Sequence, residues 1–178
     1  MKTINIVGGG GFIGSSLSKK LSRRQKKLFI GDLAANEGFP DEVGYLDVRD
    51  LSSLLSCLNG GVVVNLAAVH RDDVRNLEEY RITNVEGARN VCRACEVNNI
   101  NKIVFTSSVA VYGYATPGTD ELGEIKPLNE YGRSKALAED VYREWRDKDP
   151  ENRSLIIVRP TVVFGEGNRG NVYNLVRQ

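Results

Sequence analysis

The sequence has few of the residues that hold metal ions or form disulfides. Its 178 residues include three cysteines and one histidine, His70, whereas a structural zinc site takes about four such ligands at fixed spacings. Cys92 and Cys95 form a C-x-x-C, but they continue a helical spacing begun by Ala88 and Val91, which is typical of a buried core stripe. The sequence therefore predicts no metal site.

A bias toward one sign of charge is also absent. The chain has 24 Lys and Arg against 23 Asp and Glu, a net charge of +1, so no overall field attracts nucleic acid or an anionic membrane surface. The basic cluster within 19–27 falls at the end of a predicted helix, where cations complement the dipole. Long apolar runs and a secretory signal are missing too. We expect a soluble cytoplasmic domain without nucleic-acid or membrane partners.

Strand and helix patterns alternate along the chain. This alternation predicts an α/β fold, a Rossmann-type doubly wound parallel sheet with helices on both faces. Ligands of such sheets bind at the carboxyl ends of the strands. The predicted strands are 3–7, 27–31, 43–46, 61–66, 102–107 and 154–159, and the predicted helices lie near 12–23, 51–58, 74–98 and 131–147.

A glycine-rich turn joins the first strand to the first helix. Two registers fit the dinucleotide fingerprint, Gly9-Gly11-Gly14 or the wider Gly8-Gly11-Gly14. Glycines allow a tight turn and a close approach of the backbone to a pyrophosphate, whose charge meets the helix N-terminus. The turn and the first helical residues, Phe12 and Ile13, are therefore predicted to bind the cofactor.

The second strand runs into Asp32, at about the distance where this fold places the acid that accepts hydrogen bonds from the adenosine ribose. The glycine turn and the residues just after Asp32 carry no arginine that would accept a 2′-phosphate. These features favour NAD over NADP.

Tyr131 and Lys135 are four residues apart at the head of a predicted helix, a spacing that places both on one face. A nearby ammonium favours the phenolate and lowers the pKa of the phenol, which makes a proton-transfer group. Ser108 follows the fifth strand. His70, after the fourth, is a candidate contact to substrate, and the irregular segment 113–130 is predicted to form an active-site rim.

The order of these segments resembles the extended short-chain dehydrogenase/reductase family, in its NAD-dependent nucleotide-sugar epimerase/dehydratase branch. The resemblance covers nearly the whole chain. It is carried by Gly8–Gly14, Asp32, Asp47-Val48, Asn65–Ala68, Asn84 with Gly87, Thr106–Gly113, Tyr131–Lys135 and Arg159–Gly165.

The resemblance implies a role for each matching residue. Tyr131 would be the general base on a sugar hydroxyl, Lys135 would hold the nicotinamide ribose, and Ser108 would donate a hydrogen bond to the reacting oxygen. The remaining cofactor contacts would be Asp47 and Val48 on adenine, Leu66, Ala67 and Ala68 on the pyrophosphate and nicotinamide side, and Pro160 to Val163 on the carboxamide end.

The implied function is an NAD-dependent 4-epimerase of a nucleotide sugar, with a UDP-sugar such as UDP-galactose or UDP-N-acetylglucosamine favoured. Val109 and Ala110 stand where dehydratases of the family carry an Asp-Glu pair, which argues against dehydration. Val162 stands where typical UDP-galactose epimerases carry an asparagine. A 4-keto-sugar reductase, and a dinucleotide-binding module without turnover, remain as alternatives.

Members of the family add a C-terminal substrate lobe, whereas this chain stops within a predicted helix at 171–178. We expect 1–178 to be the NAD-binding domain, either an expressed fragment or a natural truncation, that binds NAD without turnover. An apolar patch is then left uncovered, so a homodimer is expected. Its residues are Val162, Val163, Phe164, Val172, Leu175 and Val176.

Overall fold

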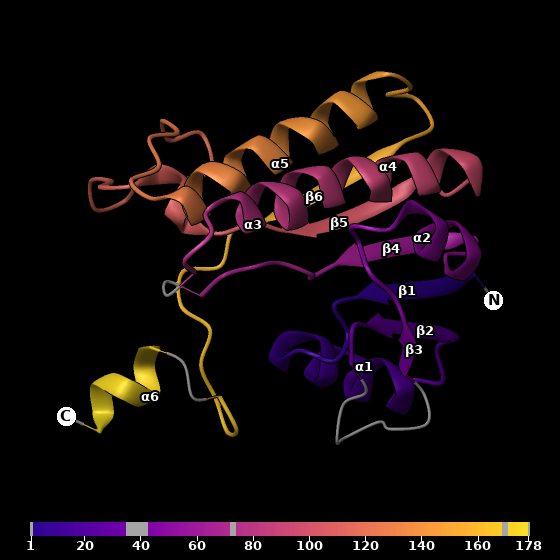
Figure 1. Ribbon diagram of the computed structural model, residues 1–178, viewed down its shortest axis with the longest axis horizontal. Coiled ribbons are helices and arrows are strands. Elements are labelled where there is room, and N and C mark those ends of the chain that lie inside the picture. Colours follow the sequence, from indigo (N-terminus) through magenta and orange to yellow (C-terminus); the bar gives the residue numbers. More distant parts are fainter. Residues whose placement is uncertain (1, 35–42, 72–73, 169–170, 178) are drawn as a thin grey trace.

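The structure is a computed structural model that describes residues 2–34, 43–71, 74–168 and 171–177, with the side chains of Asn171 and Asn174 left aside. Its centre is a six-stranded sheet in which every neighbouring pair is parallel. The strand order is β3-β2-β1-β4-β5-β6, which confirms the expected doubly wound sheet (Figure 1). The strands are β1 (Thr3–Val7), β2 (Leu28–Asp32), β3 (Val43–Tyr45), β4 (Gly61–Asn65), β5 (Lys102–Thr106) and β6 (Ser154–Val158).

Helical segments connect the strands. The ends of the predicted helices near 12–23, 51–58 and 131–147 agree with the structure to within one residue. The segments are α1 (Phe12–Arg23), α2 (Leu51–Cys57), α3 (Glu78–Tyr80), the π-helix η1 (Arg81–Glu86), α4 (Gly87–Val97), the 3-10 helix η2 (Val109–Tyr112), α5 (Glu130–Asp147) and α6 (Asn171–Val176).

The prediction of one continuous helix over 74–98 was wrong in two respects. The helical segment begins only at Glu78, and its turns from Arg81 to Glu86 are π-helical. A π-helical turn holds one more residue than an α-helical turn but is built from the same residue types. The apolar spacing therefore did not reveal the π-helix. The sequence analysis also missed η2, which Ser108 caps.

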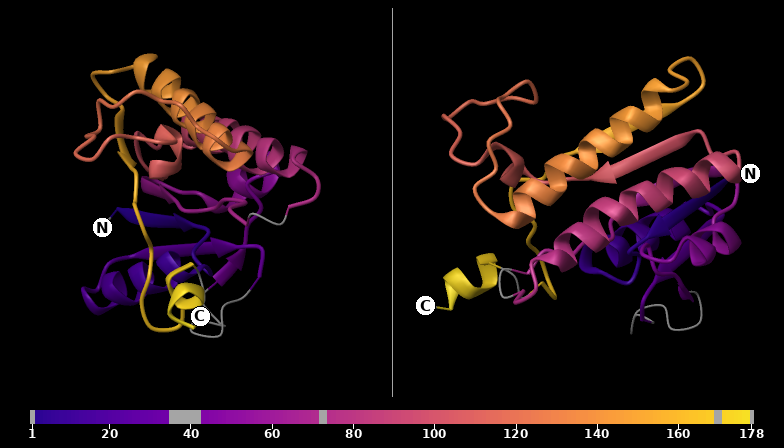
Figure 2. Two further views of the ribbon diagram at one scale, coloured as in Figure 1. Left: turned by 90° about the vertical axis from the view of Figure 1, so that its left-hand side faces the viewer. Right: turned by 45° about the horizontal axis from the view of Figure 1, so that its top comes forward.

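The main core lies between the sheet and the layer of α2, α4 and α5. Sheet residues such as Val63 and Phe105 meet Val91, Tyr142 and Trp145 there, and α4 and α5 run side by side across that face (Figures 1 and 2). Cys92 and Cys95 are buried in the same core, as the helical spacing predicted.

The opposite face of the sheet is covered by α1 along β1 and β2. Successive residues of a strand point to opposite faces, so Val7 joins the main core while Ile6 and Ile30 pack together beneath the glycine turn. Farther along that face the cover ends, and Ile156 and Val158 of β6 are 55% and 44% exposed. No helix within the described ranges is long and apolar enough to cross a membrane.

Candidate active site

The glycine turn needs glycine for steric reasons. Gly8 has a φ of +78°, and a Cβ there would lie 2.5 Å from the backbone nitrogen of Ala67. A Cβ on Gly14 would lie 2.5 Å from the carbonyl oxygen of Gly8. The loops after β1 and β4 therefore touch through bare backbone, and Gly14 supports the turn from within α1. A Cβ on Gly9 would also be too close, at 2.4 Å from Cγ2 of Ile30, so the geometry does not choose between the two registers.

A cleft of about 480 Å³ opens above this turn, between the loops that follow β1 and β4. The strand order changes direction at that point, which is where open α/β sheets bind their ligands. Eight of the predicted cofactor residues line the cleft. They are Gly8, Gly11, Asp32, Asp47, Val48, Leu66, Ala67 and Ala68.

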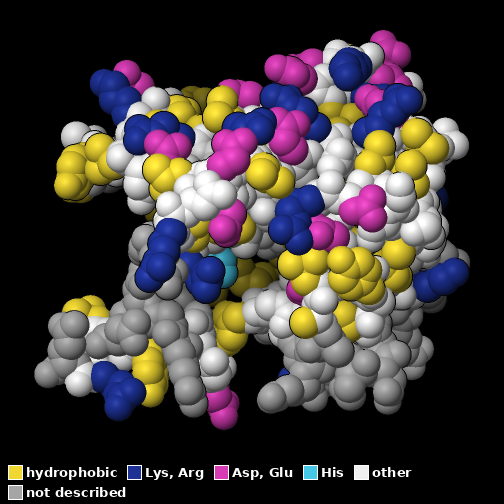
Figure 3. All heavy atoms as spheres, viewed as in Figure 1, with side chains coloured by type: hydrophobic (Ala, Val, Ile, Leu, Met, Phe, Trp, Pro, Cys, Tyr) yellow, Lys and Arg dark blue, Asp and Glu magenta, His cyan; other side chains and the backbone are white. Residues whose placement is uncertain are grey.

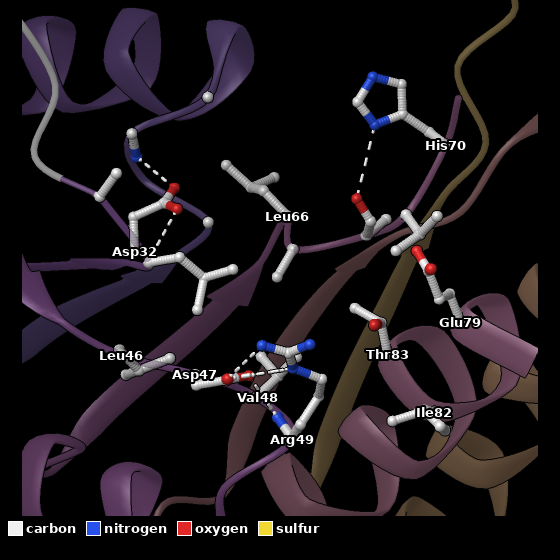
Figure 4. A pocket seen from close by; sticks show the side chains of 18 residues that line it. Asp32, Leu46, Asp47, Val48, Arg49, Leu66, His70, Glu79, Ile82 and Thr83 are labelled. Atoms are coloured by element: carbon white, nitrogen blue, oxygen red, sulfur yellow. Dashed lines mark hydrogen bonds and ion pairs between the residues drawn. The ribbon is translucent and has the colours of Figure 1, made fainter. Parts of the chain in front are cut away.

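The close view shows the side chains of the cleft converging from separate strand ends (Figure 4). His70, whose side chain is exposed, lies on the rim. In the space-filling view it is the cyan side chain at the edge of a hollow (Figure 3). Glu79, Ile82 and Thr83, from α3 and η1, complete the wall. The sequence analysis missed these three because their helix was predicted as an ordinary core helix.

Asp32 closes one end of the cleft from the tip of β2. Its Oδ2 accepts a hydrogen bond of 2.8 Å from the Gly10 backbone N–H, and its Oδ1 accepts one of 2.7 Å from Leu33. The carboxylate is thereby fixed against the glycine turn. Because a carboxylate oxygen accepts more than one hydrogen bond, Asp32 can also accept bonds from ribose hydroxyls.

Asp47, at the other wall, is engaged by its neighbour Arg49. The guanidinium contacts both carboxylate oxygens, with Nε at 2.9 Å from Oδ1 and the terminal nitrogen at 2.6 Å from Oδ2. Hydrogen bonding to Arg49 outweighs burial and lowers the pKa of Asp47. Arg49 itself lines the cleft and was not predicted, although its position directly after Asp47 and Val48 could have suggested it.

The predicted catalytic pair lies on the first turns of α5. Asn129 caps this helix by accepting a hydrogen bond from Gly132 N–H. Tyr131 is half-buried, and the Lys135 Nζ lies 6.0 Å from its ring centroid. Nζ also donates a 2.8 Å hydrogen bond to the carbonyl of Thr106, the last residue of β5, which holds the pair at the carboxyl edge of the sheet.

Lys135 is almost completely buried, with 2% of its surface exposed. Burial disfavours the charged form and lowers its pKa to about 7, while the negative charge of Glu139 opposes that shift. Ser108 lies at the same edge, and its Oγ accepts a 3.1 Å hydrogen bond from Ala110 N–H. A hydroxyl that accepts in this way still has its own proton to donate.

Asn84 connects the cleft wall to the catalytic helix. Its Oδ1 accepts from Val69 N–H at 2.9 Å, and its Nδ2 donates to the Val69 carbonyl at 3.0 Å and to Ser134 Oγ at 2.8 Å. Ser134 lies directly before Lys135. The sequence analysis used Asn84 only as a mark of resemblance, because a contact over 50 positions cannot be read from spacing.

The other predicted cofactor residues stand outside the described lining of the cleft. Phe12 and Ile13 form the first turn of α1, which has no side-chain cap. The carbonyl of Pro160 accepts from Val109 N–H at 3.2 Å. Val163 is 38% exposed and lines a second hollow together with residues of α6.

The residues of the cleft fit a dinucleotide. Bare backbone at Gly8 and Gly11 leaves room at the open N-terminus of α1, where a pyrophosphate is favoured. Asp32 supplies a fixed carboxylate, and Val48 and Leu66 supply apolar walls. The chemistry of this donor set is that of an NAD site.

Comparison with known proteins agrees with this geometry. The chain matches the NAD dependent epimerase/dehydratase family over residues 4–177. It is 47% identical, over 97% of its length, to the N-acetyl-alpha-D-glucosaminyl-diphospho-ditrans,octacis-undecaprenol 4-epimerase of Escherichia coli O157:H7, of which it covers 52%. It is 30% identical over 99% of its length to the UDP-glucose 4-epimerase of Vibrio cholerae, of which it covers 56%.

Two solved structures resemble the fold closely. A UDP-galactose 4-epimerase superposes with a TM-score of 0.86 at 28% identity, over 98% of this chain and 61% of its own. MoeE5 in complex with UDP-glucose and NAD gives 0.85 at 27% identity, over 94% and 56%. The chain therefore spans about half the length of the curated relatives it matches.

Proposed function

Because this chain belongs to the NAD dependent epimerase/dehydratase family, we propose that it is the NAD-binding part of a sugar 4-epimerase. The observation that carries the proposal is the placement of Tyr131 and Lys135 at the carboxyl edge of the sheet, beside a cleft suited to NAD. We propose that the whole of 1–178 is this domain, and that a further lobe completes the substrate site.

NAD, when bound, supplies an acceptor that takes a hydride from the sugar carbon and later returns it. The proposed residues act on the proton of the same alcohol. Tyr131 would take the proton from the hydroxyl as a general base and would later return it to the same oxygen. Ser108 donates a hydrogen bond to that oxygen, so the charge that develops there is stabilised.

Lys135 has two proposed tasks. Its ammonium favours the phenolate of Tyr131, and it donates a hydrogen bond to the nicotinamide ribose. The carboxylate of Asp32 accepts hydrogen bonds from the adenosine ribose, and the glycine turn binds the pyrophosphate at the N-terminus of α1. Asp47 and Val48 would border the adenine, with Arg49 keeping Asp47 in place.

The substrate is proposed to be an N-acetylhexosamine or hexose joined to a diphosphate. A UDP-sugar was favoured from sequence, and UDP-glucose 4-epimerases are among the relatives. The 47% identical relative is named for an N-acetylglucosaminyl group on a polyprenol diphosphate, which brings a lipid-linked sugar forward as the stronger candidate. The reacting carbon and its hydroxyl are the same in both classes.

The test uses the full-length protein with UDP-N-acetylglucosamine and undecaprenyl-diphospho-N-acetylglucosamine in parallel. Epimerisation at C4 is followed by chromatography of the released sugar. Tyr131→Phe is expected to lower turnover by about two to four orders of magnitude, while NAD affinity stays near the wild-type value. Tyr114→Phe, at a tyrosine that is 94% exposed, is the matched control. Near wild-type turnover of Tyr131→Phe would refute the mechanism.

Self-association of the 178-residue chain stays a proposal. It is supported by apolar side chains that are exposed in the C-terminal segment, among them Phe164 at 69% and Val176 at 80%. Light scattering over a concentration series tests it, and a strictly monomeric chain would exclude the homodimer.

A further inference from the structure

A buried carboxylate lies one helical turn beyond Lys135. Glu139 of α5 has a side chain that is 1% exposed, and three hydrogen bonds of 2.6 to 2.8 Å come from two guanidinium groups. Arg159 donates from Nε to Oε1 at 2.8 Å and from a terminal nitrogen to Oε2 at 2.6 Å, and Arg143 donates to Oε2 at 2.6 Å. A bidentate arginine pair fixes both the position and the plane of the carboxylate.

Arg159 is itself held from several directions. It follows β6 directly, its guanidinium carbon lies 4.9 Å from the ring centroid of Tyr112, and a terminal nitrogen donates to the phenol oxygen of that residue. The same nitrogen donates a 3.0 Å hydrogen bond to the carbonyl of Glu121 in the rim segment. Glu139 therefore cannot follow its partner outward to solvent. The charge of Glu139 therefore stays buried on α5, one helical turn from Lys135.

The site of this charge matters for Lys135. Tyr131, Lys135 and Glu139 succeed one another at intervals of four residues on one face of α5. The lysine ammonium is enclosed, with a hydrogen bond to Thr106 and the Phe105 ring at 4.8 Å. A carbonyl and an aromatic face stabilise a cation only in part, so a buried ammonium needs a compensating anion.

We propose that Glu139 is a positioning residue for the Tyr131–Lys135 pair, because its carboxylate, fixed by Arg159, keeps the enclosed ammonium of Lys135 charged. The catalytic meaning of this inference rests on the proposed function, whereas the charge relationship does not. Titratable and charged groups surround Lys135 and Glu139. They are Tyr131, Asp140 and Arg143 of α5, Tyr112 of η2, and Arg159, which follows β6.

A purely mechanical role is the competing explanation. The Glu139–Arg159 pair would then only fasten α5 to β6, and its loss would loosen the packing. Water would reach Lys135, and the pKa of the lysine would rise toward its ordinary value of 10.5. Loss of a compensating anion has the opposite effect, because the charged form of Lys135 becomes less favourable. The two roles therefore predict shifts in opposite directions.

The experiment follows the ¹³Cε resonance of Lys135 by NMR in the 178-residue chain from pH 5 to 11. The resonance is assigned by its loss in Lys135→Met. The wild-type midpoint is expected at about 7, and Glu139→Gln is expected to lower it by roughly one pH unit. The double variant Glu139→Gln/Arg159→Gln leaves no unpaired buried guanidinium. It removes one negative and one positive charge, so its midpoint is expected between that of Glu139→Gln and the wild-type value.

Two variants serve as controls. Arg143→Gln removes the more exposed partner, at 38% side-chain exposure, and should leave the midpoint unchanged. Glu139→Asp keeps the charge and should restore most of the wild-type value. A midpoint of Glu139→Gln at or above the wild-type value, or a midpoint of the double variant above the wild-type value, overturns the proposal. Failure of the proposed function is seen separately, as unimpaired epimerisation by full-length Lys135→Ala.

Discussion

The side chains of Asn84 and Ser134 are joined by a 2.8 Å hydrogen bond across 50 positions of sequence. Asn84 belongs to η1 and also holds both backbone groups of Val69 in the cleft wall. Ser134 belongs to α5 and is flanked by the proposed catalytic pair. One amide group thus fixes the distance between the cofactor wall and the helix that would carry out proton transfer.

Asn84→Ala is expected to weaken NAD binding and stability together. It leaves buried partners without hydrogen bonds, which costs about 1–3 kcal/mol in the free energy of unfolding, and it frees the Val69 segment of the cleft wall. Urea denaturation and calorimetric titration with NAD measure the two effects. Asn98→Ala is the matched control, since that amide also donates to two carbonyls but lies away from the cleft. Equal NAD affinity of the two variants would contradict the bridging role.

Gly8→Ala is expected to abolish NAD binding. The added Cβ would lie 2.5 Å from the Ala67 backbone nitrogen, so the loops after β1 and β4 must separate. Gly118→Ala provides the comparison, because its φ of +89° is similar and no atom lies within 4 Å of the new Cβ. It should lose only about 1–2 kcal/mol for the left-handed conformation. Thermal unfolding and NAD titration of both variants separate steric overlap from strain.

Asp32→Ala is expected to shift cofactor preference toward NADP. The carboxylate would repel a 2′-phosphate and accept hydrogen bonds from ribose hydroxyls, so its removal weakens NAD binding and relieves the repulsion. Calorimetric titration with both cofactors gives the ratio of the two dissociation constants. In the wild-type chain that ratio should favour NAD, and tighter binding of NADP would refute the assignment. Asp50→Ala, which removes the cap of α2, should leave the ratio unchanged.

Stability is expected to rise with pH above neutrality. The pKa of Lys135 is lowered to about 7 in the folded chain and has its ordinary value of 10.5 when unfolded. The unfolded state then binds more protons between these values, so the free energy of unfolding increases as the pH rises through 7. Lys135→Met should remove this increase, whereas Lys102→Met, at an exposed lysine, should retain it.

The buried thiols reverse the trend at higher pH. Burial raises the pKa of Cys95 to about 12 and raises that of Cys92 as well. Above pH 9 the unfolded thiols ionise while the folded ones keep their protons, and stability falls. Urea denaturation from pH 6.5 to 10.5 should therefore give a maximum between pH 8 and 9. A flat profile would show that Lys135 is not enclosed in the way described.

The parts of this fold that depend on local pattern were predictable from sequence. All six strands were predicted to within two residues, because short apolar runs bounded by turns are typical of a parallel sheet. Gly8 and Asp32 were identified because their roles depend on spacing within one βαβ unit. The cleft confirms that they lie together, while their contact with NAD remains a prediction.

The parts that depend on tertiary packing were not predictable. Arg159 and Glu139 are 20 positions apart and meet only because β6 lies beside β5 beneath α5. The predicted helix began at 74, four residues before the helical segment in the structure, and Val74 is buried although it precedes that segment. Tertiary contact buries that side chain. An apolar residue in the sequence does not show whether it is buried in this way or on the face of a helix.

The extra residue of the π-helix η1 helps to set the geometry of the site. An α-helix turns by about 100° per residue, so an added residue rotates everything before it relative to everything after it. In this chain the Tyr80 ring lies before the insertion, 6.4 Å from the ring of Tyr131, while the stripe of α4 after it faces the core. A single irregular turn thus lets one continuous helical segment line the cleft at one end and pack into the hydrophobic core at the other.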